Sequence, residues 1–235
     1  MLDKNIIIYI MTDITEKEYD KKINISKYEF ACDSVDDSIP KPLPQQGGFA
    51  MLVVGKPGMG KTTLILSLVC KSGKAFNRKF DKVFVFSPSL MSVADDPFEL
   101  IPEEQKFEEA NFDNLKEIKD TGDKVLLILD DIVSDIRGKG KGEIENLLQK
   151  IFFNRRHLCN GENHKGGSCS IIATSQTYKK IDPKLRKTAS HLVFYENKQK
   201  AEQDSVFSEV ILIPRQEYND VCRYVYDKKH NFMYI

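Results

Sequence analysis

Five short apolar runs, separated by longer polar or amphipathic stretches, organise the sequence from residue 49 onward. Each run is rich in Val, Ile, Leu or Phe and ends at a polar residue, a glycine or a proline, which is typical of strands buried on both faces. The predicted strands occupy residues 49–54, 82–88, 124–131, 169–176 and 191–196.

Two stretches between these strands have helical spacing. Residues 61–73 are apolar at helical intervals and stop at Gly73. Residues 143–157 are amphipathic. Their apolar face comprises Ile144, Leu147, Leu148, Ile151 and Phe152. Buried strands that alternate with helices predict an α/β fold, a mostly parallel sheet sandwiched by helices.

The beginning of the chain follows a different pattern. Residues 5–11 and 22–30 have the composition of strands. Residues 36–48 hold three prolines and two glycines without periodicity, which predicts a linker. We therefore expect a small β-rich extension with its linker at 1–47 and one α/β domain at 48–235.

Two further segments are predicted less regularly. The acidic residues 95–122 predict one strand-like piece and a short helix near 114–120. At the end of the chain, residues 221–235 predict a C-terminal β-hairpin with a tight turn at 227–231.

Charge is balanced over the 235 residues but unevenly distributed. Residues 137–200 hold 14 Lys or Arg against 5 Asp or Glu, whereas residues 95–135 hold 14 acids against 4 bases. Such asymmetry indicates either a surface that faces a polyanion or ordinary solvated faces. A net charge of zero argues against a globally basic nucleic-acid binder.

Cysteine usage and apolar run length bear on the compartment. The five cysteines are odd in number and show no disulfide framework, which fits a reducing, cytoplasm-like space. The apolar run at 5–11 is too short to span a bilayer, and no cleavage site follows it. No membrane span is expected.

Between the first buried strand and the first helix, Gly55, Gly60, Lys61 and Thr62 match the pattern G-x-x-x-x-G-K-[ST]. The glycines, Gly58 included, let successive backbone N–H groups point at phosphate oxygens, and the helix adds its positive end. Lys61 is expected to reach the β- and γ-phosphates, and Thr62 to offer its hydroxyl to Mg²⁺. The predicted nucleotide-binding residues are Gly55, Lys56, Pro57, Gly58, Met59, Gly60, Lys61, Thr62 and Thr63.

The strand at 124–131 ends in two acids, Asp130 and Asp131. Asp130 is expected to hold Mg²⁺, usually through water. Asp131 is expected to polarise the attacking water as the general base, or else to cap the following segment. An NTPase with a second acid places an extra strand between the phosphate-loop strand and the acid-bearing strand. Gln176 fits the sensor position at the tip of that extra strand, ahead of Thr174 and Ser175, with a helix cap as the alternative.

Three arginines are candidates for neutralising charge in the transition state. Arg155 and Arg156 close the predicted helix at 143–157, and Arg186 lies between the last two predicted strands. Each could act in its own subunit or from a neighbour as an arginine finger. The alternative for each is helix-dipole compensation or a surface ion pair.

Four segments, "GKPGMGKTT", "LLILDDI", "FFNRRH" and "IIATSQTYKKIDPKLRKTAS", occur here in an order and spacing similar to those of a known family. Over roughly residues 47–195 the chain resembles the poxvirus-type genome-packaging ATPases of large double-stranded DNA viruses, which belong to the FtsK/HerA superfamily. The resemblance implies an ATP-hydrolysing motor that moves double-stranded DNA into a capsid.

The same resemblance implies catalytic roles for Lys61, Thr62, Asp130, Asp131 and Gln176, with ATP and Mg²⁺ as cofactors. It favours Arg155, Arg156 and Arg186 for sensing or for activation in trans. The implied partners are double-stranded DNA, further copies of the chain in a ring and a capsid or portal-type component. The implied location is the host cytoplasm or the virion.

Two glycine-rich loops add a prediction and a departure. Arg137, Lys139 and Lys141 alternate with glycines after the acid-bearing strand, and we expect them to contact DNA phosphates. An ordinary solvated loop is the alternative.

The segment 158–170 is longer than the short link that the packaging ATPases lead us to expect. The spacing of Cys159, His164 and Cys169, with His157 nearby, fits no zinc pattern, so a flexible insertion is expected.

Other functions remain open at this point. A nucleoside or nucleotide kinase shares the phosphate-binding loop, but no lid-like segment is evident and the second acid favours water as the acceptor. A low-turnover ATP-binding assembly module is the other alternative. Another DNA motor, such as a helicase, would be a near relative.

Overall fold

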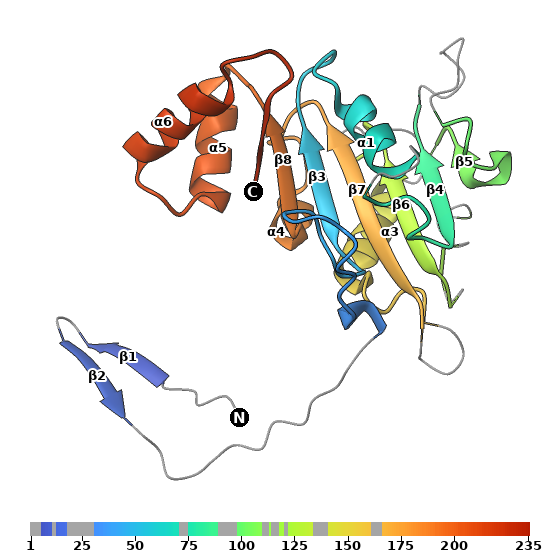
Figure 1. Ribbon diagram of the computed structural model, residues 1–235, viewed down its shortest axis with the longest axis horizontal. Coiled ribbons are helices and arrows are strands. Elements are labelled where there is room, and N and C mark those ends of the chain that lie inside the picture. Colours follow the sequence, from blue (N-terminus) through green and yellow to red (C-terminus); the bar gives the residue numbers. More distant parts are fainter. Residues whose placement is uncertain are drawn as a thin grey trace.

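The computed structural model describes residues 6–10, 13–17, 31–70, 75–88, 98–109, 113, 118–119, 122–133, 141–160 and 166–235. Its centre is a seven-stranded sheet with the order β5-β4-β6-β7-β3-β8-β9 (Figure 1). All neighbours are parallel except β8 and β9, which pair antiparallel. The strands are β3 (Ala50–Val54), β4 (Lys82–Phe86), β5 (Lys106–Phe107), β6 (Lys124–Leu129), β7 (Ser168–Ser175), β8 (His191–Tyr195) and β9 (Phe232–Tyr234).

Helices cover both faces of this sheet, as the alternation of strands and helices predicts (Figure 1). They are α1 (Lys61–Val69), α3 (Lys141–Asn154), α4 (Pro183–Thr188), α5 (Lys200–Val210) and α6 (Arg215–Val225), with 3-10 turns at Ala31–Asp33 and Glu103–Gln105. The predicted α/β fold with a mostly parallel sheet is therefore confirmed.

The side-chain alternation of β3 shows why its sequence is apolar throughout. Ala50, Leu52 and Val54 pack on the face covered by α3, whereas Met51 and Val53 pack on the opposite face with Ile65 of α1. Successive side chains of a strand point to opposite faces, so a strand covered on both faces has no solvent-facing position to make polar. On α3, the buried residues are Leu148, Ile151 and Phe152.

The first part of the chain forms a two-stranded antiparallel unit and a packed irregular segment. β1 (Ile6–Ile10) matches the first predicted strand. It pairs with β2 (Asp13–Lys17) in a register that sets Ile6 opposite Lys17. The second strand expected at 22–30 lies outside the described residues. The Pro/Gly segment at 36–48 is irregular, as predicted, yet it packs on the domain, because Ile39 is buried in the cluster under α1.

An exposed contact also holds this irregular segment. Lys79 Nζ lies 2.8 Å from Asp36 Oδ2. Hydrogen bonds from the Lys79 and Ser38 side chains lower the pKa of the Asp36 carboxyl to about 2. At a pH above the ordinary carboxyl pKa, ionised Asp36 therefore stabilises the folded state. This stabilisation is lost as the pH falls toward 2.

The predicted C-terminal hairpin is wrong in its first half. Its second strand is present as β9, but β9 pairs with β8, and the residues before it form α6. Residues 221–226 have the β-branched and aromatic composition of a strand. Over the longer window from Arg215, however, Tyr218, Cys222 and Val225 recur at helical spacing. Tyr218 is buried, and its ring centroid lies 5.3 Å from that of Phe207 on α5, so packing on α5 selects the helix.

The remaining predicted elements are confirmed or lie outside the description. The strand-like piece of the acidic stretch is β5, which pairs with β4 and forms the edge of the sheet. The short helix expected at 114–120 falls mostly outside the described residues. Among the residues described, no helix is long and apolar enough to cross a membrane.

Candidate functional site

The loop between β3 and α1 has the backbone geometry that phosphate binding requires. Gly58 and Gly60 have φ angles of 75° and 95°, in the left-handed region where a side chain is strained. α1 begins directly after this turn, at Lys61, so its first N–H groups face the loop. The sequence from Gly55 to Thr63 therefore forms a concave backbone surface at the positive end of a helix, which suits an anion.

Lys61 lies over this loop. Its side chain is buried, with 7% of the residue exposed, and its Nζ donates to the carbonyl oxygen of Gly55 at 2.8 Å. The ammonium group is thereby held at the loop before any phosphate is bound. A preorganised cation of this kind interacts with phosphate charge without further ordering of its long side chain.

Tyr195, which the sequence did not identify, supports the loop from β8. A Cβ atom at Gly55 would lie 2.8 Å from the Tyr195 Cβ, so only glycine fits there without a shift. The Tyr195 hydroxyl donates to the carbonyl oxygen of Gly60 at 3.3 Å. Burial raises the pKa of Tyr195 to about 12, so the hydroxyl stays protonated and can donate at neutral pH.

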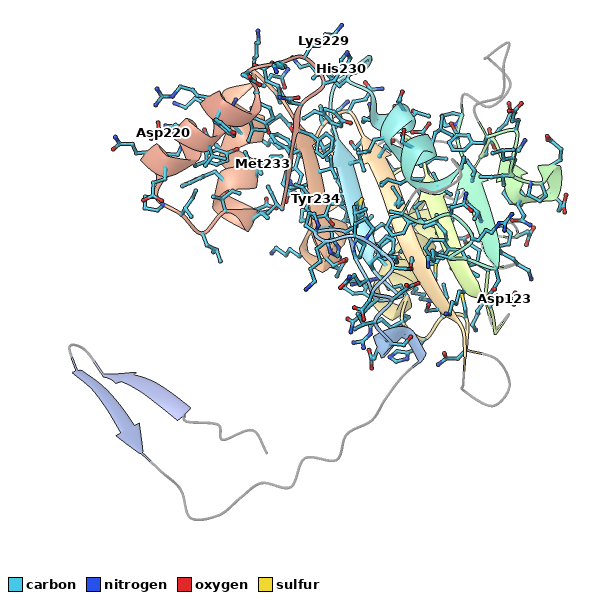
Figure 2. The ribbon with its side chains drawn as sticks, in the orientation of Figure 1. Asp123, Asp220, Lys229, His230, Met233 and Tyr234 are labelled. Carbon is cyan, nitrogen blue, oxygen red and sulfur yellow. The ribbon has the colours of Figure 1, made fainter. Side chains whose placement is uncertain are left out.

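His230, also missed by the sequence, contacts the loop from the turn between α6 and β9. Its Nδ1 lies 3.1 Å from the carbonyl oxygen of Met59. Because a carbonyl only accepts, Nδ1 must carry the hydrogen. His230 has a φ angle of 72°, an uncommon conformation for a residue with a side chain. Figure 2 shows His230 and Lys229 at the loop end of the sheet.

The first of the two acids is buried and oriented by two hydroxyls. Asp130 is 7% exposed and follows β6 directly. Its Oδ2 accepts from Ser87 Oγ at 3.1 Å, and its Oδ1 accepts from Thr174 Oγ1 at 2.8 Å. These bonds fix the carboxylate of Asp130 at the carboxyl end of the sheet, beside the loop.

The second acid contacts the same threonine and also reaches the tip of β7. Asp131 has a φ angle of 54°, and its N–H donates to Thr174 Oγ1 at 2.8 Å. Its Oδ2 accepts from Gln176 Nε2 at 3.2 Å. The left-handed conformation places the second carboxylate at the tip of β7, where its other oxygen, Oδ1, lies 3.5 Å from the Thr174 hydroxyl.

The position of β7 makes this meeting possible. β7 pairs with β3 on one side and with β6 on the other, so the strand that ends at Gln176 lies between the phosphate loop and the acids. The predicted extra strand is therefore present. Lys61, Asp130, Asp131 and Gln176 all lie at the carboxyl end of the parallel strands, where such sheets bind ligands.

Arg155 and Arg156 lie at the opposite end of the sheet. Arg155 donates from Nε to the carbonyl oxygen of Gly48 and from a terminal nitrogen to that of Phe152, both at 2.7 Å. Arg156 pairs with Asp33. Because Gly48 precedes β3 and the loop follows it, roughly 20 Å of strand separates these arginines from their own loop.

The environment of Arg155 differs from that of an exposed arginine. Burial, and then the nearby charge of Arg156, lower its pKa. Both arginines line a pocket with His191, whose pKa is lowered by burial and then by Arg155. The two arginines therefore do not contribute to the site at the loop of their own subunit. A role at the nucleotide site of a neighbouring subunit stays a prediction.

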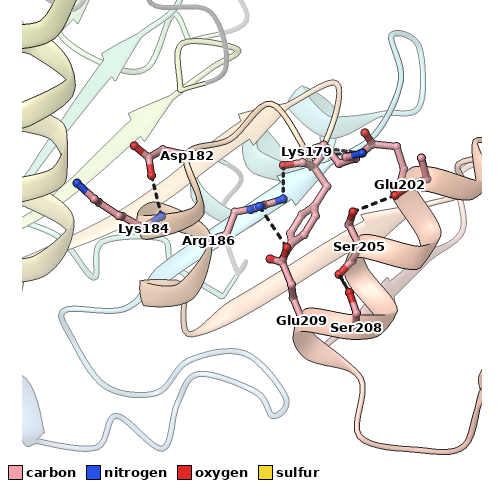
Figure 3. Close-up of polar contacts among 10 residues, drawn as sticks. Lys179, Asp182, Lys184, Arg186, Glu202, Ser205, Ser208 and Glu209 are labelled. Atoms are coloured by element: carbon pink, nitrogen blue, oxygen red, sulfur yellow. Dashed lines mark hydrogen bonds and ion pairs between the residues drawn. The ribbon is translucent and has the colours of Figure 1, made fainter.

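Arg186 is engaged within its own subunit (Figure 3). Its side chain is 8% exposed, lies 3.1 Å from Glu209 Oε1, and donates to the carbonyl oxygen of Tyr178 at 3.4 Å. The guanidinium also lies 4.7 Å from the centroid of the Tyr178 ring. Tyr178 donates to the same Glu209, and burial raises the pKa of its hydroxyl. Arg186 thus ties α4 to α5.

The cysteine and histidine residues form no metal site in the described part of the chain. Cys159 and Cys169 are buried, and the Cys159 thiol lies 3.2 Å from the carbonyl oxygen of Ile118. The hydrogen bond with Cys159, followed by burial, raises the pKa of Cys169, so this thiol stays protonated. His164 lies outside the described residues.

The predicted DNA-contacting loop is described only at its end. Arg137 and Lys139 lie outside the described residues. Lys141 is the first residue of α3, and its Nζ lies 3.6 Å from Glu145 Oε1, one helical turn away. Both side chains are largely exposed, so this pair leaves the Lys141 ammonium accessible to other anions.

Strand order, phosphate loop and paired acids together define a P-loop NTPase. A family model described as the NACHT domain matches residues 50–209, and the chain belongs to that family. No curated protein matched the sequence.

Solved structures share the fold at low sequence identity. The DNA-packaging ATPase of Sulfolobus turreted icosahedral virus is 13% identical, with a TM-score of 0.52 over 80% of this chain and 92% of that one. The sulfate-bound genome-packaging NTPase of Sulfolobus turreted icosahedral virus 2 is 13% identical, with a TM-score of 0.57 over 80% and 90%. The pCW3 conjugation coupling protein is 9% identical, with a TM-score of 0.51 over 80% and 57%.

Replacing Thr174 by Val tests whether its hydroxyl organises both acids. The change removes one buried donor to Asp130 and one acceptor from Asp131, so we expect a loss of about 1–3 kcal/mol in the free energy of unfolding. Urea denaturation measures this loss.

Thr177→Val is the matched control. The Thr177 hydroxyl is buried without a hydrogen-bond partner among the described residues. Its removal should change stability by no more than about 0.5 kcal/mol, or raise it. Equal losses in the two variants would contradict the proposed role of Thr174.

Proposed function

We propose that this chain is an ATP-hydrolysing motor that translocates double-stranded DNA and packages a viral genome into its capsid. The observation that carries the hydrolytic part is the hydrogen bond from Gln176 to Asp131 at 3.2 Å, beside the phosphate loop. An amide and a carboxylate that face one position can hold a water molecule and accept its proton.

The residues at the loop divide the chemistry between them. Backbone N–H groups and Lys61 hold the β- and γ-phosphates, and Lys61 neutralises charge that grows during transfer. Asp131 takes the proton of the attacking water, and Gln176 orients that water.

Mg²⁺ fits the donor set at this site. Thr62 is the second residue of α1, and the buried Asp130 carboxylate is held by two hydroxyls. Both side chains offer the oxygen ligands that Mg²⁺ prefers. Each carboxylate oxygen keeps a lone pair beyond these hydrogen bonds, which allows contact through water. When bound, the ion would neutralise phosphate charge.

Water is a better acceptor here than a nucleoside. A kinase requires a pocket that admits the acceptor and excludes water. Here the second acid, Asp131, is instead paired with Gln176, an arrangement that suits a water molecule. A low-turnover assembly module needs no Asp131–Gln176 pair, so measured turnover separates that alternative from a motor.

Two observations support DNA as the substrate of the motor. Two of the similar structures are those of viral genome-packaging enzymes, and their likeness to this chain extends over four fifths of its length. Residues 137–200 carry a basic excess that suits a phosphate backbone. A ring would give Arg155 and Arg156, at the far end of the sheet, a neighbouring site on which to act. A capsid or portal-type partner and action in the host cytoplasm or virion complete the proposal.

The ATPase rate should rise when duplex DNA is added. In the double variant Lys139→Ala/Lys141→Ala, basal turnover should persist while DNA stimulation is lost. The logarithmic salt dependence of DNA binding should also flatten by about 0.9 for each lost phosphate contact. A steady-state assay across a salt series measures both effects.

The pair Lys198→Ala/Lys200→Ala provides the control, because it removes two charges at the same spacing elsewhere in the basic segment. It should leave DNA stimulation intact. If the Lys139/Lys141 variant keeps full stimulation, those lysines do not contact DNA. If the wild type shows none, the motor proposal fails.

Mixing two inactive variants tests a site shared between subunits. Of the three candidate arginines, Arg156 is the most open to substitution, since its side chain is 48% exposed. An Asp131→Asn subunit could still lend Arg156 to an Arg156→Ala neighbour whose own acids are intact. Activity of the mixture above that of either variant supports action in trans. Full activity of Arg156→Ala alone would exclude Arg156.

A further inference from the structure

The turn at residues 227–231, between α6 and β9, lies against the phosphate loop although it is far away in sequence. His230 Nδ1 donates to the carbonyl oxygen of Met59 at 3.1 Å. A Cβ atom at Gly60 would lie 3.7 Å from the same nitrogen. Figures 1 and 2 show this turn reaching the loop end of the sheet.

The strand order fixes the direction in which a bound nucleotide extends. β7 and β6, which carry Gln176 and the two acids, lie on one side of β3, whereas β8 and β9 lie on the other. The terminal phosphate must face the acids for hydrolysis. The ribose and base of a nucleotide stretched across the loop therefore extend toward β8, β9 and the turn that His230 belongs to.

An open pocket of about 480 Å³ lies at that turn. Its volume falls in the range of roughly 300–1,000 Å³ that is usual for small-molecule sites. Two aromatic residues line it, Tyr224 with 84% exposure and Phe232 with 37%. The Phe232 ring centroid lies 5.4 Å from that of Tyr195, which contacts Gly55 and Gly60. Aromatic packing through the buried Tyr195 ring thus connects the loop to the pocket.

Polar groups line the remaining pocket wall. Asp227, Lys228 and His230 all border the pocket. The side chain of Asn231 donates to Asp227 Oδ1 and to the carbonyl oxygen of Val225, both at 2.9 Å, which fixes the turn. An aromatic face with a carboxylate and an ammonium at its rim suits a planar heterocycle whose edge carries hydrogen-bond donors and acceptors.

We infer that this pocket binds the purine base of the nucleotide whose phosphates occupy the loop, with Tyr224 as the stacking residue. The inference rests on the proposed nucleotide-binding function and adds to it the subsite that holds the base. His230 joins the two parts, because its hydrogen bond to Met59 ties the pocket wall to the backbone of the loop. Base and phosphates are then held by one continuous surface.

Tyr224→Ala tests the subsite without disturbing the fold, because the side chain is mostly exposed. Binding of Mg·ATP and of inorganic tripolyphosphate to the full chain is measured by calorimetry. Tripolyphosphate carries the phosphates without the base. We expect ATP to bind about tenfold more weakly to the variant, within the range of a lost base–aromatic stack, and tripolyphosphate to bind as before.

Two controls sharpen the result. Tyr224→Phe keeps the ring and should keep the wild-type affinity for ATP. Val221→Ala lies one turn earlier on α6, is 38% exposed in the wild type and does not line the pocket, so it should have no effect.

The outcomes are distinct. Unchanged ATP affinity in Tyr224→Ala overturns the base subsite, and so do equal losses for ATP and tripolyphosphate, which would indicate a distorted loop. Wild-type protein that binds tripolyphosphate as tightly as ATP also overturns the subsite while leaving the phosphate loop in place. Wild-type protein that binds neither ligand overturns the proposed function, and the inference with it.

Discussion

The hydroxyl of Thr174 is the contact on which the arrangement of the site depends. It donates to the Asp130 carboxylate and accepts the N–H of Asp131, both at 2.8 Å. Two consecutive acids would ordinarily repel each other, yet here one is fixed in a buried position and the other is turned toward Gln176. The left-handed backbone at Asp131 has a free-energy cost of order 1 kcal/mol, which the surrounding hydrogen bonds offset. β7, placed between β3 and β6, supplies this hydroxyl.

The phosphate loop is held from the other side by residues of the last third of the chain. Tyr195 packs on Gly55 and donates to Gly60, and His230 donates to Met59. These contacts come from β8 and from the turn before β9, so the antiparallel addition of β9 to the sheet also positions a wall of the site. The two acids and Gln176 therefore lie on one flank of β3, and the residues that contact the loop from β8 and the turn lie on the other.

The parts that were predictable from the sequence share a physical reason. Buried strands such as β3 and β6 must be apolar throughout, and a glycine-rich loop needs its own residue types, so both leave strong local signals. Asp131 meets Gln176 because β7 lies beside β6. The sequence predicts this strand order from the two acids after one strand and the polar residue at the end of the next. The family resemblance extended this prediction to function.

The residues that the sequence missed depend on distant packing. Nothing local marks His230 as a neighbour of Met59, 171 positions earlier. The composition of residues 221–226, rich in Val and Tyr, predicts a strand, whereas the packing of Tyr218 on Phe207 selects the helix α6. Arg186 was a reasonable candidate by its position in the sequence, and only the structure reveals its engagement with Glu209 and Tyr178.

The most direct test of this account is phosphate release from ATP by Asp131→Asn, with ATP binding measured on the same protein. Loss of a general base should lower turnover by about 10²–10⁴-fold while the affinity for ATP stays close to that of the wild type. The exposed Asp220→Asn change is the matched control and should leave turnover unchanged. If Asp131→Asn hydrolyses ATP within a few-fold of the wild-type rate, the pair formed by Asp131 and Gln176 does not carry the reaction.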